Sequence, residues 1–230
     1  MNIHRLRRLF SLALPLMLAG CGGPEGSVDL TGYSEIACTD QNISVSGLTL
    51  TPEPDFVQLR FFDSYKEDGQ APTPPLSLSS SGQPCATATD VPACTAALEN
   101  AIATSGFQYS CMGKGGCTKH HFLVTTRGDE VKTYSTKAEV QQLLGTVDTE
   151  QEAVLKAFAD NYSFVCGNKE QGAVKKNEDG SFNVIGTNGY ACGPGTELTQ
   201  HVLKVTASGE VQELETRVLE EGTSVCPAGQ

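Results

Sequence analysis

The sequence is poor in the residues and motifs that identify most catalytic sites. It has no tryptophan and only four histidines. It contains no C-x-x-C pair, no G-x-S-x-G or S-x-x-K nucleophile motif and no H-E-x-x-H zinc motif. These absences argue against a thioredoxin-like redox site, a zinc knuckle and the common hydrolase sites. We therefore expect no metal and no cofactor, and the sequence favours a protein that is not an enzyme.

Basic residues and long apolar runs are also scarce. The longest run near the start, residues 9–18, has ten residues, whereas a membrane-spanning helix needs about 20. Without Arg5, Arg7 and Arg8, the only charged residues among the first 20, 13 basic residues face 27 acidic ones, a net charge of −14. Such a surface argues against nucleic acid or anionic lipid headgroups as partners.

The first 25 residues have the order of an export signal. A basic start and a short apolar run lead to Leu18-Ala19-Gly20-Cys21. This segment resembles bacterial lipoprotein precursors, whose lipobox is L-[A/S]-[G/A]-C. The resemblance implies that residues 1–20 are a signal peptide and that a lipid on Cys21 anchors the chain to a membrane of the cell envelope. Gly22, rather than an aspartate, favours the outer membrane over the inner one. An ordinary signal peptide with an incidental cysteine is the alternative.

The remaining chain is expected to form one globular domain over residues 38–226. Residues 21–37 are expected to be a flexible tether, and the Pro- and Ser-rich residues 63–84 a surface loop. An ungapped match between 109–128 and 190–209 suggests two related hairpin modules, 85–135 and 166–219, although hairpins also look alike because turns use few residue types.

Eight cysteines remain after Cys21, and an even number in an exported chain predicts four disulfides. The repeat suggests one bridge in each module. The four expected bridges are Cys85–Cys111, Cys166–Cys192, Cys94–Cys117 and Cys38–Cys226.

Hydrophobic patterns predict an α+β fold, with an antiparallel sheet built from hairpins, two or three short helices and disulfide staples. Strands are expected at 43–50 and 56–62, and hairpins at 120–134, 172–185 and 199–219. Helices are expected at 91–104, capped by Asp90, and after Thr136 and Thr149, which form capping boxes with Glu139 and Glu152.

Few side chains suggest chemistry. His120 and His121 are adjacent on a strand and should point to opposite faces, while His120 and His201 would meet only if their hairpins paired. The loop at 113–116 lacks P-loop spacing. Arg127-Gly128-Asp129 spells an adhesion tripeptide, but Gly-Asp also suits a hairpin turn. The pairs Glu152/Asp160 and Glu210/Glu213/Glu215 are expected on exposed faces.

The sequence thus favours a lipid-anchored, disulfide-rich envelope protein with a binding, assembly or structural role and a protein or envelope-polymer partner. The alternatives are a hydrolase of envelope polymers with unidentified catalytic carboxylates, and a lipoprotein toxin or effector.

The lipobox generates a direct prediction. Cys21→Ala should stop both lipidation and cleavage, because the thiol is the site of acylation in this class. The precursor should accumulate at its uncleaved mass and carry no labelled fatty acid. Normal maturation of the variant would contradict the lipoprotein interpretation.

Overall fold

The computed structural model describes residues 28–63, 73–110 and 119–223. These residues form a mixed α+β fold that contains more strand than helix. The helices are α1 (Val91–Glu99), α2 (Lys137–Leu144) and α3 (Glu150–Ala159). The strands are β1 (Ser34–Glu35), β2 (Cys38–Thr39), β3 (Asn42–Ile43), β4 (Phe56–Asp63), β5 (Leu76–Gly82), β6 (Phe107–Ser110), β7 (Lys119–Arg127), β8 (Glu130–Tyr134), β9 (Ala173–Lys176), β10 (Phe182–Gly189), β11 (Glu197–Val205) and β12 (Val211–Glu221). Within these ranges, no helix is both long and apolar enough to cross a membrane.

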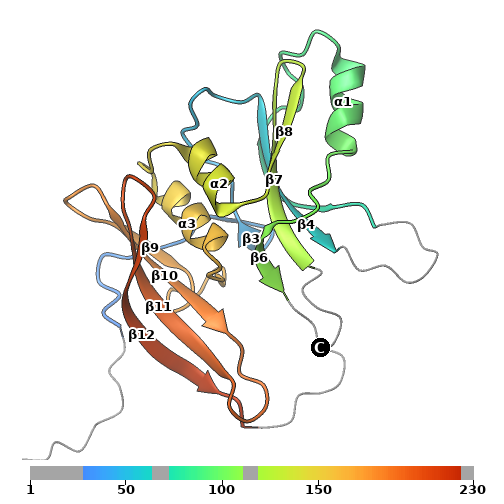
Figure 1. Cartoon of the computed structure of the whole chain (residues 1–230). Coiled ribbons are helices and arrows are strands. Elements are labelled where there is room, and N and C mark those ends of the chain that lie inside the picture. Colours follow the sequence, from blue (N-terminus) through green and yellow to red (C-terminus); the bar gives the residue numbers. More distant parts are fainter. Residues whose placement is uncertain (1–27, 64–72, 111–118, 224–230) are drawn as a thin grey trace, which may run out of the picture.

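The strands form two five-stranded antiparallel sheets and one small ribbon, rather than the single sheet that we expected. The N-terminal sheet has the order β5-β4-β7-β6, with β8 also paired to β7. The C-terminal sheet has the order β1-β9-β10-β11-β12, and β2 pairs with β3 in the ribbon. Figure 1 shows the two sheets at opposite ends of the molecule, with α2 and α3 between them.

The three hairpins predicted from the sequence are confirmed. They are formed by β7–β8, β9–β10 and β11–β12, each closed by the turn expected from its Gly and Asp or Ser residues. In β11–β12 the ladder runs from Val205 opposite Val211 to Glu197 opposite Glu221. Two register shifts interrupt this ladder, next to Leu198 and next to Val202.

Three other segments differ from the prediction. Residues 44–50 are irregular, because α3 side chains satisfy their backbone: Gln151 donates to the Ser44 carbonyl, and Glu152 accepts from the Thr49 N–H. Part of the expected 63–84 loop is β5, in which Ser79 is buried and donates to the Ile43 carbonyl. The last part of the expected tether belongs to the fold, because β1 pairs with β9.

The helices begin where the sequence predicts. Both capping boxes are present, with Thr136 and Thr149 accepting from the N–H groups of Glu139 and Glu152, which accept in return from the cap residues. Asp90 caps α1 through its carboxylate. This helix ends at Glu99 instead of extending to residue 104, because the Asn100 side chain takes the Ala96 carbonyl and ends the hydrogen-bond ladder.

α3 is the central element of the fold. Every residue from Gln151 to Ala159 is buried, and the helix contacts β9, β10 and β11 of the C-terminal sheet and β6 of the N-terminal sheet. Its apolar side chains belong to one core cluster that includes residues of both sheets, such as Leu59 and Leu203. The expectation that Glu152 lies on an exposed face is therefore wrong, because a helix between two sheets has no solvent-facing side.

The disulfides differ from all four pairs that we expected. Cys38 bonds Cys166, and Cys85 bonds Cys94. Cys192 is also disulfide-bonded, and its partner lies outside the described residues. All four expected bridges are therefore excluded. Each contained one of Cys38, Cys85, Cys94 and Cys166, and these four cysteines bond to one another. The expectation failed because it assumed one equivalent bridge per module, whereas Cys38–Cys166 joins the β2–β3 ribbon to the segment after α3. Cys21 itself, like Cys111, Cys117 and Cys226, lies outside the described residues.

The two bridges should contribute unequally to stability. Cys38–Cys166 closes a sequence separation of 128 residues and Cys85–Cys94 one of 9. Loop-closure entropy then predicts that replacing both cysteines by serine costs about 5 kcal/mol for the long bridge and about 2.5 kcal/mol for the short one. Urea unfolding of the two double variants measures this difference. Equal losses, or a larger loss for the short bridge, would contradict it.

Candidate functional site

His201 lies at the centre of a polar group on the C-terminal sheet. It stands on β11, opposite Gly186 of β10 and Thr216 of β12. Its Nδ1 is 2.7 Å from the Glu213 carboxylate, and the Tyr162 ring meets the imidazole edge-on, with centroids 5.1 Å apart. Burial, followed by the charges of Glu213 and Asp160, raises the pKa of the Tyr162 hydroxyl. The phenol therefore stays protonated at neutral pH.

A surface hollow opens beside this group. The His201 groove, as we call it, has a volume of about 440 Å³ and is lined by Asn188, Gly189, Gly195, Glu197, Thr199 and His201. Glu197 and Glu221 face each other in the ladder next to it, and Tyr190 nearby is 64% exposed. The lining includes one carboxylate and no lysine or arginine, so the groove suits a neutral or cationic group better than an anion.

The Glu213–His201 pair could orient an imidazole for proton transfer. Nucleophilic catalysis also requires a hydroxyl or thiol hydrogen-bonded to that imidazole. Thr199 is two residues away on the same strand, yet no hydrogen bond joins its hydroxyl to His201 among the contacts of the described residues.

His120 and His121 do lie on opposite faces of β7. His120 is buried and contacts the Ala103 carbonyl at 3.2 Å. His121 packs against the rings of Phe61 and Phe158, and its Nδ1 is 3.1 Å from the Gln108 carbonyl. Neither meets His201, because β7 and β11 belong to different sheets.

Gln108 links the two sheets next to His121. Its φ of +52° is left-handed, a conformation that costs energy for a residue with a side chain. In this conformation the side-chain amide of Gln108 donates to the Tyr162 carbonyl at 3.0 Å and to the Ser163 hydroxyl at 2.9 Å. Gln108 thus contacts His121 through its backbone carbonyl and residues 162 and 163 through its side-chain amide.

A second hollow lies under α2. It has a volume of about 210 Å³, between α2, the segment 51–54 and the β7–β8 hairpin. Its charged lining consists of Arg127, Glu130 and Lys132. Arg127 is 3.7 Å from Glu130, and the Lys132 ammonium stands 5.0 Å from the centre of the Tyr134 ring. Two basic side chains and one acidic side chain leave this hollow with a net charge of +1, and each of them already has a partner within the lining.

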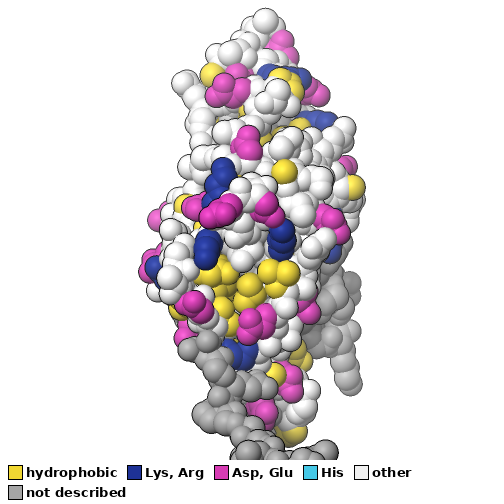
Figure 2. Space-filling model, turned by 90° about the vertical axis from the view of Figure 1, so that its left-hand side faces the viewer, with side chains coloured by type: hydrophobic (Ala, Val, Ile, Leu, Met, Phe, Trp, Pro, Cys, Tyr) yellow, Lys and Arg dark blue, Asp and Glu magenta, His cyan; other side chains and the backbone are white. Residues whose placement is uncertain are grey.

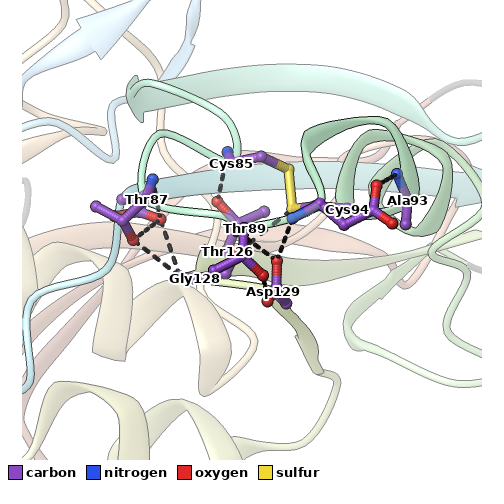
Figure 3. The surroundings of a disulfide bond; sticks show 10 residues. Cys85, Thr87, Thr89, Ala93, Cys94, Thr126, Gly128 and Asp129 are labelled. Atoms are coloured by element: carbon purple, nitrogen blue, oxygen red, sulfur yellow. Dashed lines mark hydrogen bonds between the residues drawn. A yellow bond between two sulfur atoms is a disulfide. The ribbon is translucent and has the colours of Figure 1, made fainter.

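The adhesion tripeptide is part of a structural cluster around the Cys85–Cys94 bridge (Figure 3). The Asp129 carboxylate accepts from the Thr89 N–H, the Thr89 hydroxyl and the Asp90 N–H. These hydrogen bonds lower its pKa. The Gly128 N–H donates to Asp55 and to Thr87. Since its carboxylate is already engaged, the Arg-Gly-Asp sequence serves the fold, as its hairpin position suggested.

Sequence reasoning missed Tyr162 and the contact between Glu213 and His201. Glu210, Glu213 and Glu215 are exposed, as expected, and Glu213 is in addition the partner of His201. An unbroken register would place Glu215 opposite His201; the shift next to Val202 inserts one residue and brings Thr216 there instead. Neither the shift nor the approach of Tyr162 has a signal in the local sequence.

In the part of the chain that the structure describes, no three His, Cys, Asp or Glu side chains are grouped so as to hold a metal ion. The glycine-rich loop at 113–116 lies outside that part. Comparisons of the chain with protein-family models, with curated proteins and with solved structures found no match.

His121 generates a prediction about pH. Burial, partly opposed by its hydrogen bond to Gln108, lowers its pKa below the ordinary value of 6.5. The unfolded chain then binds more protons than the folded one below about pH 6.5, so stability falls as the pH falls through that range. His121→Phe keeps an aromatic ring but cannot titrate. Its free energy of unfolding should drop less between pH 7.5 and 5.5 than that of the unmodified protein.

The comparison is made between two pH values within each protein, so the lost hydrogen bond to Gln108 cancels. His201→Phe serves as the control at a histidine on the other sheet. An unchanged pH dependence in His121→Phe would show that another group causes the acid sensitivity.

Proposed function

We propose that this protein is a bacterial cell-envelope lipoprotein, anchored through a lipid on Cys21, whose disulfide-bonded domain binds another component of the envelope. The lipobox sequence supports the anchor, and the two disulfides are consistent with an oxidising compartment. Gly22 supports the outer membrane as the location. The proposed role is binding, assembly or structural support.

The observation that carries the binding role is the His201 groove. It is open to solvent, polar and close to the exposed Tyr190, a residue type common at recognition surfaces. Carboxylates that could otherwise suggest a hydrolase hold the fold instead: Glu152 caps α3, Glu139 caps α2, and Asp55 and Asp129 hold the loop around the short disulfide.

Site-specific photo-crosslinking in intact cells tests this role. A photo-reactive amino acid at Thr199, inside the groove, should give a discrete adduct of higher mass with a protein or an envelope polymer. The same amino acid at Ser80, an exposed position on β5 of the other sheet, is the matched control and should not give that adduct.

Two outcomes would contradict the proposal. The absence of an adduct from Thr199, in a protein shown to be lipidated and folded, would remove the groove as a binding site. The same adduct from Ser80 would show that the contact is not specific to the groove.

A further inference from the structure

The outer face of the C-terminal sheet is the face opposite α3. Residues 28–33 run across it, so that Tyr33 packs over Ala173, Ile185 and Val202, with Val28 and Leu30 beside them. Figure 1 shows this segment in blue along the left side of the sheet. Figure 2 looks at that side and shows apolar side chains gathered in its middle, with basic and acidic side chains around them.

Val28 and Leu30 are only partly covered. They cover the sheet with one side and leave the other side open to solvent. Together with the apolar side chains gathered there in Figure 2, they make this face a candidate contact surface.

The rim of this face carries lysines in positions typical of an interface. Lys175 lies over the Tyr33 ring, 5.6 Å from its centre, and donates to the Thr31 carbonyl. Lys169 donates to the Tyr33 carbonyl at 2.8 Å. Basic side chains beside an aromatic ring at the edge of an apolar patch are typical of surfaces that contact a membrane interface.

The local charge also differs from that of the whole chain. Lys204 and Arg217 on this side pair with Asp179 and Glu170. Lys169 and Lys175 stand among the acids Asp29, Glu35 and Glu215. The net charge of −14 argues against headgroup binding by the protein as a whole, but four of the basic side chains are gathered on this face.

The position of Cys21 decides what covers the face. Six residues lie between Cys21 and Val28, so their Cα atoms are at most about 25 Å apart. A lipid on Cys21 would therefore keep the Val28 end of the outer face close to the bilayer at all times. Such tethering raises the effective concentration of lipid at this face and makes even a weak contact populated.

From these observations we infer that the outer face of the C-terminal sheet, centred on Val28, Leu30 and Tyr33, rests on the membrane surface. This inference depends on the lipid anchor of the proposed function. The apolar centre lies in the headgroup region, with Lys169 and Lys175 at its rim. α1 lies at the other end of the molecule (Figure 1) and projects away from the bilayer.

The absence of tryptophan makes this orientation measurable. The lipidated full-length protein is reconstituted into vesicles of phosphatidylethanolamine and phosphatidylglycerol, with and without lipids brominated on their acyl chains. Leu30→Trp introduces a single fluorophore in the outer face. Leu76→Trp is the matched control, because Leu76 is 61% exposed on β5 of the other sheet.

The expected result is a blue shift and at least twofold quenching for Leu30→Trp, with no quenching for Leu76→Trp. Absence of quenching for Leu30→Trp, or equal quenching at both positions, overturns the inference. Flotation of the vesicles tests the anchor separately: a protein that floats but shows no quenching keeps the proposed function, and one that does not float removes it. If melting shows that Leu30→Trp is misfolded, Val28→Trp makes the same test.

Discussion

A single buried carboxylate holds the two halves of this molecule in register. Glu152 has no exposed surface, and its two oxygens accept from the Thr49 N–H, the Thr49 hydroxyl, the Asp148 N–H and the Thr149 N–H, at 2.7 to 3.1 Å. A buried charge is tolerated only when such donors replace water. Because the donors come from the helix start and from residue 49, the same interaction fixes α3 and the segment that leads into the N-terminal sheet.

α3, placed in this way, determines the remaining architecture. One side of it packs on the C-terminal sheet, and the residues that follow it position Tyr162 and receive the side chain of Gln108. The groove at His201 thus depends on both sheets, although its lining comes from one. The turn between β11 and β12 is docked in the same region: the Val147 N–H donates to the Ala207 carbonyl, and Gln141 lies so close to Gly209 that a Cβ would collide with it. The opposite end of the hairpin, at the groove, remains open.

Local signals predicted much of this fold. The hairpins and both capping boxes follow from turn residues and cap residues that act within a few positions of each other, and these were found. The predictions that failed concern segments whose structure depends on contacts with residues distant in sequence. Residues 44–50 do not form the expected strand because side chains of α3 make hydrogen bonds to their backbone. β5 was missed because a serine-rich segment becomes a strand only when β4 offers it an edge. Glu152 was misplaced because a pattern of acids does not show that a second sheet covers the helix.

The internal repeat predicted neither the surroundings of the histidines nor the disulfide pairing. His120 and His201 do occupy corresponding positions on β7 and β11, yet one is buried beside Phe62 and the other lies beside a groove. The bridges do not follow the repeat. Cys38, which has no counterpart in either module, bonds Cys166, the cysteine at the start of the second module.

The Cys38–Cys166 bridge determines how a pulling force on the N-terminal tether is transmitted through the domain. Sixteen residues lie between Cys21 and Cys38, where the chain becomes covalently joined to Cys166. Tension applied to the tether therefore divides at Cys38, and the sulfur–sulfur bond carries it directly to the segment just past α3. The 127 residues between these cysteines, which include the whole N-terminal sheet and α3, form a closed loop that is shielded from the pull. In the described part of the chain before Cys38, residues 28–37 are held by contacts with the C-terminal sheet, such as β1 with β9 and Tyr33 with Ile185. A stretched tether would therefore peel off this short segment first.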